Sequence, residues 1–221
     1  MKNFYGRRFS RNHKNKILDL NSACKYFLSE DNIKEKILEF RKIYTSVNLE
    51  IGFGNGDNLI NLAANNPNAG FIGCDPFWSG NVIVSKKISL MSLNNILISN
   101  LEFSKCFEYL KGLKYENIFI LFPDPWPKRK HAKRRLVNSK FYKMIKIIIQ
   151  NEGKVFLKSD YTDYICDMVS IFLRDGEFLM ARTFLEKQNI FPFKNTKYAI
   201  KSVENHNFPH LIVFKYIPKK I

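Results

Sequence analysis

The stretch Leu49-Glu-Ile-Gly-Phe-Gly-Asn-Gly56 places three glycines directly behind an apolar run. The apolar residues of 47–51 are typical of a short buried strand, and those of 57–65 recur at helical spacing. Glycines at positions 52, 54 and 56 allow a tight turn in which the backbone can approach a ligand without interference from Cβ atoms. The sequence therefore predicts a strand, a glycine-rich turn and a helix, in that order.

The alternation of strand and helix patterns continues along the chain. We expect helices over residues 31–44, 57–65, 82–93, 102–111, 139–150 and 162–174, the first behind a possible cap at Asp31. We expect strands over residues 47–51, 71–75, 96–99, 117–122, 154–159, 177–184 and 211–216. Repeated βα units imply an α/β fold with a mostly parallel, seven-stranded sheet and helices on both faces. The last two strands have no helix between them and should form an antiparallel pair that closes the sheet.

The composition indicates one folded domain with a polyanionic partner. A length of 221 residues suits one hydrophobic core, and we assign residues 21–221 to a single domain behind a basic arm, 1–20, that is expected to be mobile. Lys and Arg number 36 against 20 Asp and Glu, a net charge of +16 that favours nucleic acid over a membrane surface as the partner. Nine of these cations and no acid lie between residues 125 and 151, so a general bias in composition does not explain the whole excess.

The cysteines and the apolar runs argue against several classes of protein. The 4 cysteines are widely separated and form no C-x-x-C pair, which suggests neither a metal site nor a disulfide framework and fits a reducing cytoplasm. No apolar run approaches the roughly 18 residues that a membrane span needs. The N-terminus lacks the apolar segment of a secretory signal. We therefore expect a cytoplasmic protein with no metal and no membrane association.

A second motif is Phe122-Pro-Asp-Pro-Trp-Pro-Lys-Arg-Lys-His-Ala-Lys-Arg-Arg135. It follows an apolar run and presents Asp124 between two prolines, then Trp126, then six Lys or Arg within eight residues. The prolines predict a stiff loop at the end of a strand rather than a helix, and carboxyl ends of strands are where open α/β sheets bind ligands. A solvated charged loop is the alternative interpretation. Trp126 could brace this loop or stack on a base.

Two acids bear on the ligand of the glycine turn. Glu50 lies on the strand just before it, and Asp75 ends the second strand, where a carboxylate can accept both ribose hydroxyls of an adenosine. A dinucleotide site would need its third glycine one residue later than Gly56. Glu50 could instead be an acid paired inside a strand end, because an unpaired buried carboxylate is costly.

These glycines and acids resemble the S-adenosylmethionine site of the Rossmann-like methyltransferases. Residues 50–56 taken with 122–137 resemble the bacterial tRNA (guanine-N7-)-methyltransferase family, whose Phe-Pro-Asp-Pro-Trp element is followed by His and by Lys-Arg-Arg. Segments 159–161 and 196–198 are similar to two further motifs of that family, and the resemblance spans about residues 47–216. It implies a Rossmann-like methyltransferase fold, S-adenosylmethionine as cofactor, and methyl transfer to N7 of a guanosine in the variable loop of tRNA by a monomer or homodimer.

The resemblance also implies site residues. Those expected to bind or border the cofactor are Glu50, Gly52, Gly54, Gly56, Asp75, Glu102 and Asp124. Those expected to bind the substrate are Lys128, Asp160, Thr196, Lys197, Tyr198 and Ala199, and those expected to bind RNA are Lys130, His131, Lys133, Arg134 and Arg135. Three positions depart from the family pattern, with Asp75 for Glu, Glu102 for Asp and Ala199 for Glu. Asp160 could alternatively cap the helix that begins at 162.

Guanine N7 carries a lone pair and no proton, so attack on a methyl donor needs no general base. Positive charge moves onto the base during transfer, which makes Asp124 the candidate catalytic residue. The glycine turn and Asp124 should then open onto one cavity. Two alternatives remain. The first is methylation of an exocyclic amine, for which Asp124 would normally be followed by two prolines. The second is an RNA-binding subunit with a vestigial cofactor site, and the intact glycines count against it.

Overall fold

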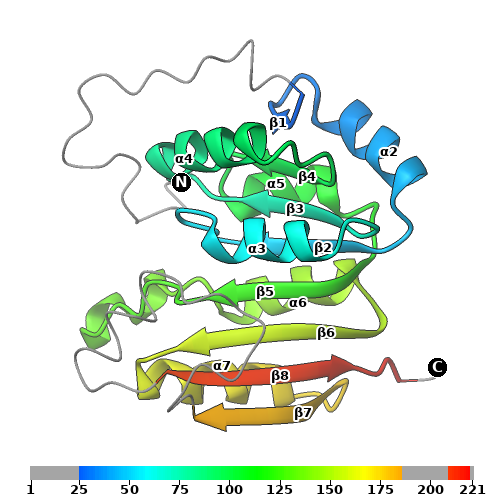
Figure 1. Ribbon diagram of the computed structural model, residues 1–221. Coiled ribbons are helices and arrows are strands. Elements are labelled where there is room, and N and C mark those ends of the chain that lie inside the picture. The colour runs from blue at the N-terminus through cyan, green and yellow to red at the C-terminus, as the bar shows by residue number, and fades with distance from the viewer. Residues whose placement is uncertain (1–24, 186–208, 220–221) are drawn as a thin grey trace. The chain divides into compact units, whose positions relative to one another are not determined.

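The computed structural model describes residues 25–185 and 209–219, and the chain divides into two compact units, Met1–Leu110 and Lys111–Ile221 (Figure 1). Each unit has its own strands and helices. The expected basic arm and the segment with Thr196, Lys197, Tyr198 and Ala199 lie outside the described residues. The single domain over residues 21–221 stays a prediction.

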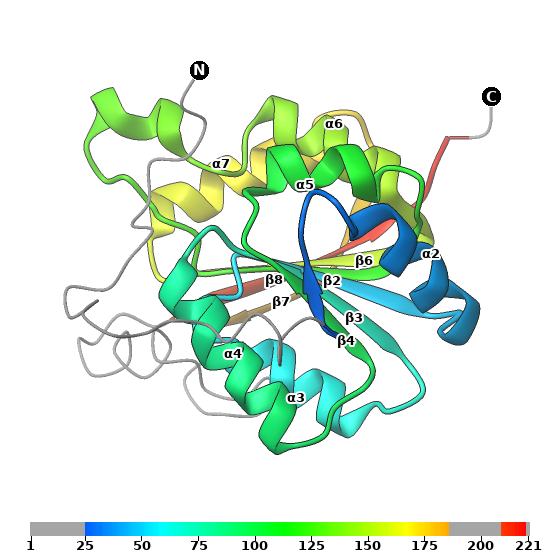
Figure 2. The same cartoon turned by 90° about the horizontal axis from the view of Figure 1, so that it is seen from above.

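The first unit is a parallel sheet with helices on both faces. Its strands lie in the order β1 (Phe27–Leu28), β4 (Ile96–Ser99), β3 (Gly70–Cys74) and β2 (Val47–Ile51). Helices α3 (Asp57–Asn65) and α4 (Trp78–Leu90) cover one face, and α2 (Ile33–Ile43) and α5 (Phe103–Leu110) cover the other (Figure 2). The predicted βα units are confirmed. The two-residue strand β1 was not predicted, because it is too short to show a period.

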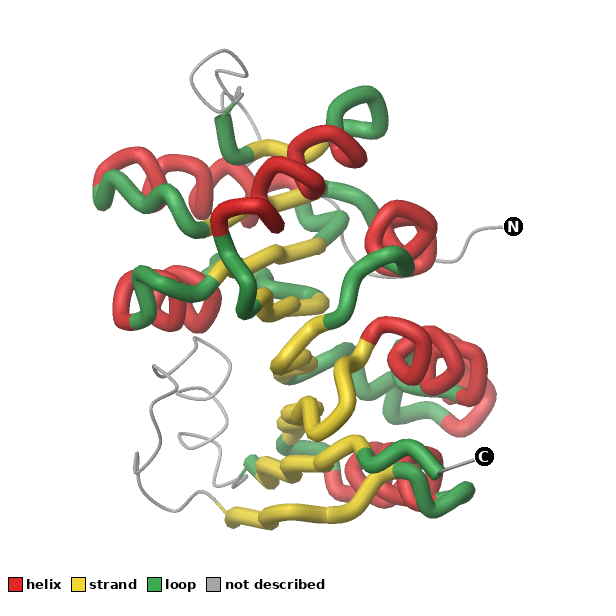
Figure 3. Tube along the Cα trace, turned by 90° about the vertical axis from the view of Figure 1, so that its right-hand side faces the viewer, coloured by secondary structure: helices red, strands yellow, loops and turns green. Residues whose placement is uncertain are grey.

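The second unit combines parallel and antiparallel pairing. Strands β5 (Tyr115–Leu121) and β6 (Ile149–Ser159) are parallel, whereas β8 (His210–Tyr216) runs antiparallel to both β6 and β7 (Phe178–Leu185). Helices α6 (Ser139–Ile148) and α7 (Thr162–Leu173) lie on the same face of these strands (Figure 3). The predicted antiparallel pair is confirmed, and so is the mostly parallel α/β fold. Helix α6 ends earlier than predicted because Ile149 pairs with Tyr115 in the sheet.

Each unit has its own hydrophobic core. In the first unit, apolar side chains of α3 and α4, such as Leu59 and Val84, pack on those of the strands. In the second unit the core is aromatic, and the ring of Phe172 stacks on Phe214 at 5.1 Å and meets Phe178 edge-on at 5.0 Å. Fully burying one such side chain contributes about 1.5–3 kcal/mol, so these clusters hold the helices on the strands. Within the described ranges, no helix combines the length and the apolar character needed to cross a bilayer.

The start of α4 fits against the glycine turn only because residue 80 has no side chain. A Cβ atom on Gly80 would stand 2.0 Å from the carbonyl oxygen of Gly54 and 2.8 Å from Cδ1 of Phe77. The first of these contacts is with backbone, which cannot move aside cheaply. The turn and the helix N-terminus are therefore in direct contact.

We predict that Gly80→Ala lowers the free energy of unfolding by about 1–3 kcal/mol, the usual cost of overpacking, although alanine is the better helix former. Denaturant unfolding monitored by circular dichroism measures this change. Gly112→Ala is the matched control, because a Cβ atom there meets nothing within 4 Å. Equal stability of the two variants would contradict the close packing of α4 on the turn.

Candidate functional site

The three glycines after β2 all have left-handed backbone conformations, but they serve two purposes. Their φ angles are 81° at Gly52, 56° at Gly54 and 69° at Gly56. Cβ atoms on Gly52 and Gly54 would meet nothing within 4 Å, whereas one on Gly56 would stand 2.3 Å from Cγ2 of Val84. The first two glycines therefore leave open space beside the backbone for a ligand, and the third lets α4 pack against the turn.

Asp75, directly after β3, fastens the glycine turn. Its Oδ2 accepts a hydrogen bond of 2.6 Å from the Gly54 N–H, and its Oδ1 accepts one of 2.8 Å from the Phe77 N–H. The side chain is only 7% exposed. A carboxylate has about four acceptor sites in all, so hydrogen bonds to the turn are compatible with binding of a ligand hydroxyl. The sequence predicted only the second of these roles.

Glu50 is buried at the end of β2, with 3% of its surface exposed. Its Oε2 accepts a hydrogen bond of 2.9 Å from Nδ2 of Asn58, so the pairing considered from the sequence is present. Loss of hydration raises the pKa of Glu50 to about 8, and the charges of Asp75 and Asp57 add to the increase although the Asn58 hydrogen bond opposes it. Glu50 is therefore mostly protonated at neutral pH.

Polar groups of α4 and α5 also lie near the ends of these strands. Asn81 donates hydrogen bonds from Nδ2 to the carbonyl oxygens of Asp75, at 2.7 Å, and Phe77, at 3.1 Å. Among the described residues, its Oδ1 and the Oγ of Ser85 are buried without a hydrogen-bond partner. Glu102 precedes α5, where its carbonyl oxygen accepts from the N–H groups of two helix residues and its Oε1 accepts from Ser104. Its contact with a cofactor stays a prediction.

In the second unit, the loop after β5 carries Asp124 between two residues with left-handed backbone, Phe122 at φ 52° and Trp126 at φ 44°. Such conformations cost on the order of 1–3 kcal/mol for residues other than glycine and occur where surrounding contacts enforce them. The N–H of Phe122 donates to the carbonyl oxygen of Lys158 at 2.7 Å. Asp124 remains exposed, although partial loss of hydration raises its pKa above the ordinary value.

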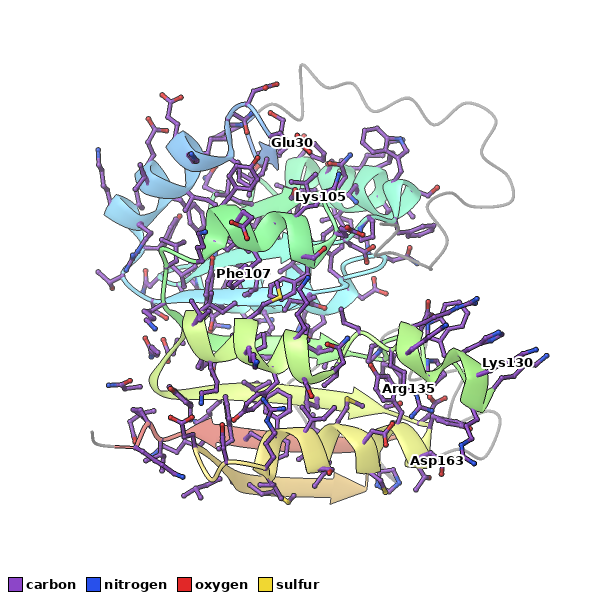
Figure 4. The ribbon with its side chains drawn as sticks, turned by 180° about the vertical axis from the view of Figure 1, so that it is seen from behind. Glu30, Lys105, Phe107, Lys130, Arg135 and Asp163 are labelled. Carbon is purple, nitrogen blue, oxygen red and sulfur yellow. The ribbon has the colours of Figure 1, made fainter. Side chains whose placement is uncertain are left out.

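Four of the cations that follow are exposed, and together they form the basic surface of the second unit. They are Lys128, Arg129, Lys130 and Lys133. Residues Arg129–Arg134 form a 3-10 helix, η1, so the prediction of a loop is right for residues 122–128 and wrong for this segment. Figure 4 shows Lys130 projecting outward from it. Loss of hydration lowers the pKa of His131, and the surrounding cations lower it further, so its imidazole is neutral at physiological pH.

Trp126 braces the loop. Its ring meets His131 edge-on with 5.9 Å between centroids, and the guanidinium of Arg134 lies 4.9 Å from its centroid. The bracing role considered from the sequence is therefore the one that these contacts support.

The surroundings of Arg135 and Asp160 bear on two further predictions from the sequence. Arg135 was expected to grip phosphate, but it is 9% exposed, and its guanidinium contacts Pro125 and Asp167. Asp160, directly after β6, is partly exposed. The N-cap of α7 is Tyr161, and no side chain caps that helix, so the capping role considered for Asp160 is wrong. Asp160 therefore remains a candidate ligand of the base.

The raised pKa of Glu50 makes stability depend on pH. Because the folded protein holds this proton more tightly than the unfolded chain does, the contribution is complete below about pH 4.5 and is lost as the pH rises through about 8. Each pKa unit corresponds to about 1.4 kcal/mol. We expect Glu50→Gln, which stays neutral, to flatten the fall in melting temperature between about pH 4.5 and about pH 8.

Circular dichroism melts across this pH range test the expectation. The control is Glu39→Gln, at an exposed position on α2. A fall in melting temperature as steep in Glu50→Gln as in the wild type would mean that Glu50 is not the group responsible.

Comparison with known proteins agrees with the motifs. A family model described as "Putative methyltransferase" matches residues 44–208. The solved "Structure of an Antibiotic Related Methyltransferase" is similar with a TM-score of 0.63 at 21% identity, covering 86% of this chain and 95% of that chain, which supports the fold alone.

Three curated relatives are similar in sequence. The tRNA (guanine-N(7)-)-methyltransferase of Wolbachia pipientis wMel is 37% identical over 136 residues, 62% of each protein. A bifunctional methyltransferase of Rickettsia felis is 33% identical over 91% of this chain, which spans 37% of that relative's length. The tRNA (guanine-N(7)-)-methyltransferase of Mycoplasmopsis pulmonis is 32% identical over 187 residues, 85% of this chain and 87% of the relative. With these matches over most of its length, the chain belongs to the tRNA (guanine-N(7)-)-methyltransferase family.

Proposed function

We propose that this protein transfers a methyl group from S-adenosylmethionine to N7 of a guanosine in the variable loop of tRNA. The observation that carries the proposal is the presentation of Asp124 at the carboxyl end of β5, in a loop with left-handed backbone on both sides and with exposed cations after it. Membership of the family adds support, because relatives 32% and 37% identical are named tRNA (guanine-N(7)-)-methyltransferase.

The residues of the first unit fit the methyl donor. Gly52 and Gly54 leave open space beside the turn, and Asp75 keeps hydrogen-bonding capacity for ribose hydroxyls. The unpartnered oxygens of Asn81 and Ser85 offer further polar contacts among the described residues. Bound S-adenosylmethionine supplies a methyl group on a positively charged sulfur. Gly56 contributes through packing rather than through ligand contact.

The chemistry calls for orientation and electrostatics rather than proton transfer. N7 of guanine has a lone pair and no proton, so in-line attack needs no general base. Holding the base in line can supply on the order of 7–11 kcal/mol of the rate acceleration. Positive charge appears on the base as the methyl group moves, and the carboxylate of Asp124 stabilises that charge in the transition state more than in the ground state.

The basic surface supplies affinity for RNA. Lys128, Lys130 and Lys133 are exposed and can contact phosphates, which positions the tRNA without selecting its sequence. A guanosine must leave its stack to reach the enzyme, which favours a loop over a duplex. Asp160 can then accept hydrogen bonds from the guanine edge.

Incubation of the protein with labelled S-adenosylmethionine and unmodified tRNA tests the function. The methylated tRNA is then treated with borohydride and aniline, which cleave the RNA at N7-methylguanosine. Cleavage at the labelled base is the expected result. Label that resists cleavage points to the exocyclic-amine alternative, and tRNA binding without any transfer of label points to a non-catalytic RNA-binding subunit.

For Asp124→Asn, which keeps the size and removes the charge, we expect kcat to fall about 10²- to 10³-fold while tRNA affinity stays close to wild type. Steady-state kinetics and filter binding measure the two effects. Since the pKa of Asp124 is raised, wild-type activity should be lost on acidification at a higher pH than an ordinary aspartate would cause. Unchanged turnover in Asp124→Asn would refute the assigned role.

The salt dependence of binding tests the basic surface. Each phosphate contact adds roughly 0.7–0.9 to the slope of log affinity against log salt, so Lys130→Ala should reduce the slope by that amount. Lys143→Ala is the matched control, because Lys143 is an exposed lysine on α6, outside the basic surface. Equal slopes for both variants would show that Lys130 contacts no phosphate.

A further inference from the structure

Arg135 ends the basic motif in the sequence but does not belong to the basic surface. Its side chain is 9% exposed, whereas Lys130, five residues earlier, is exposed. Figure 4 shows the contrast, with Lys130 pointing away from η1 and Arg135 lying on the side of α7. A cation this deeply buried must have partners within the protein, since burying an unpaired charge is costly.

The partners of Arg135 come from two directions. Its Nε donates a hydrogen bond of 2.8 Å to the carbonyl oxygen of Pro125, and its Nη1 forms an ion pair with Asp167 on α7. Its guanidinium also lies 4.9 Å from the ring centroid of Tyr164 and 5.8 Å from that of Tyr161. A planar guanidinium suits such a position, because it can donate along its edge and stack on its face.

The hydrogen bond to Pro125 matters because of where it acts. Pro125 directly follows Asp124, and neither Pro123 nor Pro125 has an N–H with which to tie the loop to its surroundings. The residues on either side, Phe122 and Trp126, are both left-handed. Arg135 therefore supplies an anchor at the middle of a strained segment, one residue from the proposed catalytic carboxylate.

The two tyrosines near the guanidinium connect Arg135 to the second acid, Asp160. Tyr161 directly follows Asp160 and is the N-cap of α7, where its carbonyl oxygen accepts from the N–H groups of Tyr164 and Ile165. The hydroxyl of Tyr164 accepts a hydrogen bond of 2.9 Å from the N–H of Val137, two residues beyond Arg135. The loop that carries Asp124 and the helix start that carries Asp160 are thus both in contact with Arg135.

We propose that Arg135 is a positioning residue that fixes Asp124 relative to Asp160, with Asp167 as its counter-charge, and that it does not contact RNA. The inference rests on the proposed function, because it gives the two acids their roles. A lysine at this position keeps the charge but loses the planar edge and face, so it cannot bind Pro125 and Asp167 while stacking on the two rings. Arg135→Lys therefore separates positioning from charge.

The main experiment compares Arg135→Lys with Arg174→Lys. Arg174 is the matched control because its guanidinium also lies over a tyrosine ring, 4.4 Å from the centroid of Tyr142, and it hydrogen-bonds Ser139. We expect Arg135→Lys to lower kcat about 10- to 100-fold, the usual effect of a small misplacement, with KM for tRNA and the salt slope unchanged. Arg174→Lys should match the wild type in all three quantities.

A readout independent of methyl transfer uses the loop itself. The chain has 2 tryptophans, so Trp78→Phe leaves Trp126 as the single reporter of the loop. Adding Arg135→Lys should change the emission of Trp126 while the melting temperature stays close to that of the background. If the wild type fails to methylate tRNA, the proposed function is lost, yet the Trp126 signal still shows whether Arg135 holds the loop.

Asp167→Asn provides a second route if Arg135→Lys does not fold. The Asp167 side chain is 53% exposed, so this substitution should be tolerated while it removes the counter-charge. It should shift the Trp126 emission in the same direction and lower kcat by a smaller factor. Millimolar guanidinium should restore part of the kcat of Arg135→Ala, and ammonium at the same ionic strength should not.

A different set of results is expected if Arg135 binds phosphate. A phosphate-binding Arg135 would keep kcat and Trp126 emission in Arg135→Lys, and Arg135→Ala would reduce the salt slope by roughly 0.7–0.9. That pattern would overturn the proposal and return Arg135 to the basic surface.

Discussion

The carboxyl ends of β2 and β5 are each followed by a turn in which some residues adopt left-handed backbone conformations. After β2 these residues are glycines, and the hydrogen bond between Asp75 and the Gly54 N–H keeps that turn against the start of α4. After β5 they are Phe122 and Trp126, for which the conformation is costly and needs support from surrounding contacts. Those contacts include the Lys158 carbonyl and the Arg135 side chain. Every candidate ligand-binding group near these strand ends depends on the two turns keeping their shape.

Charge is distributed unevenly between buried and exposed positions. Glu50 is buried and mostly protonated, and Arg135 is buried and paired with Asp167, whereas the cations of the basic surface remain in water. Only the arginine of this pair is buried, and the desolvation of a buried charge offsets much of the attraction to its partner. The value of the Arg135 pair lies in the single geometry that it imposes on the loop. The proposed contacts of the exposed cations with phosphates need no such geometry, since electrostatic attraction acts over several ångströms.

The proposed reaction fits this separation of buried and exposed charges. Methyl transfer to N7 requires no proton acceptor, so the protein can contribute by holding two molecules and by placing one negative charge near the base. Rigid turns on the first unit suit a cofactor with many fixed hydrogen-bonding groups. A braced carboxylate beside an exposed basic surface, on the second unit, suits a nucleotide within a large polyanion. Membership of the tRNA (guanine-N(7)-)-methyltransferase family is consistent with both of these features.

Apart from β1 and η1, the sequence alone determined the order of the strands and helices along the chain. It also determined the parallel βα units, the antiparallel pair at the end and the family, because these depend on local periods and on residues close together in the chain. It also predicted Asp75 and Asp124 as site residues. The tertiary structure decided what these residues touch: that Asp75 fastens Gly54, that Glu50 is protonated, and that Arg135 faces inward although it ends a run of cations. A run of cations has no period that separates buried from exposed positions. The ion-pair partner of Arg135, Asp167, lies 32 residues away in the chain, and only folding brings the two together.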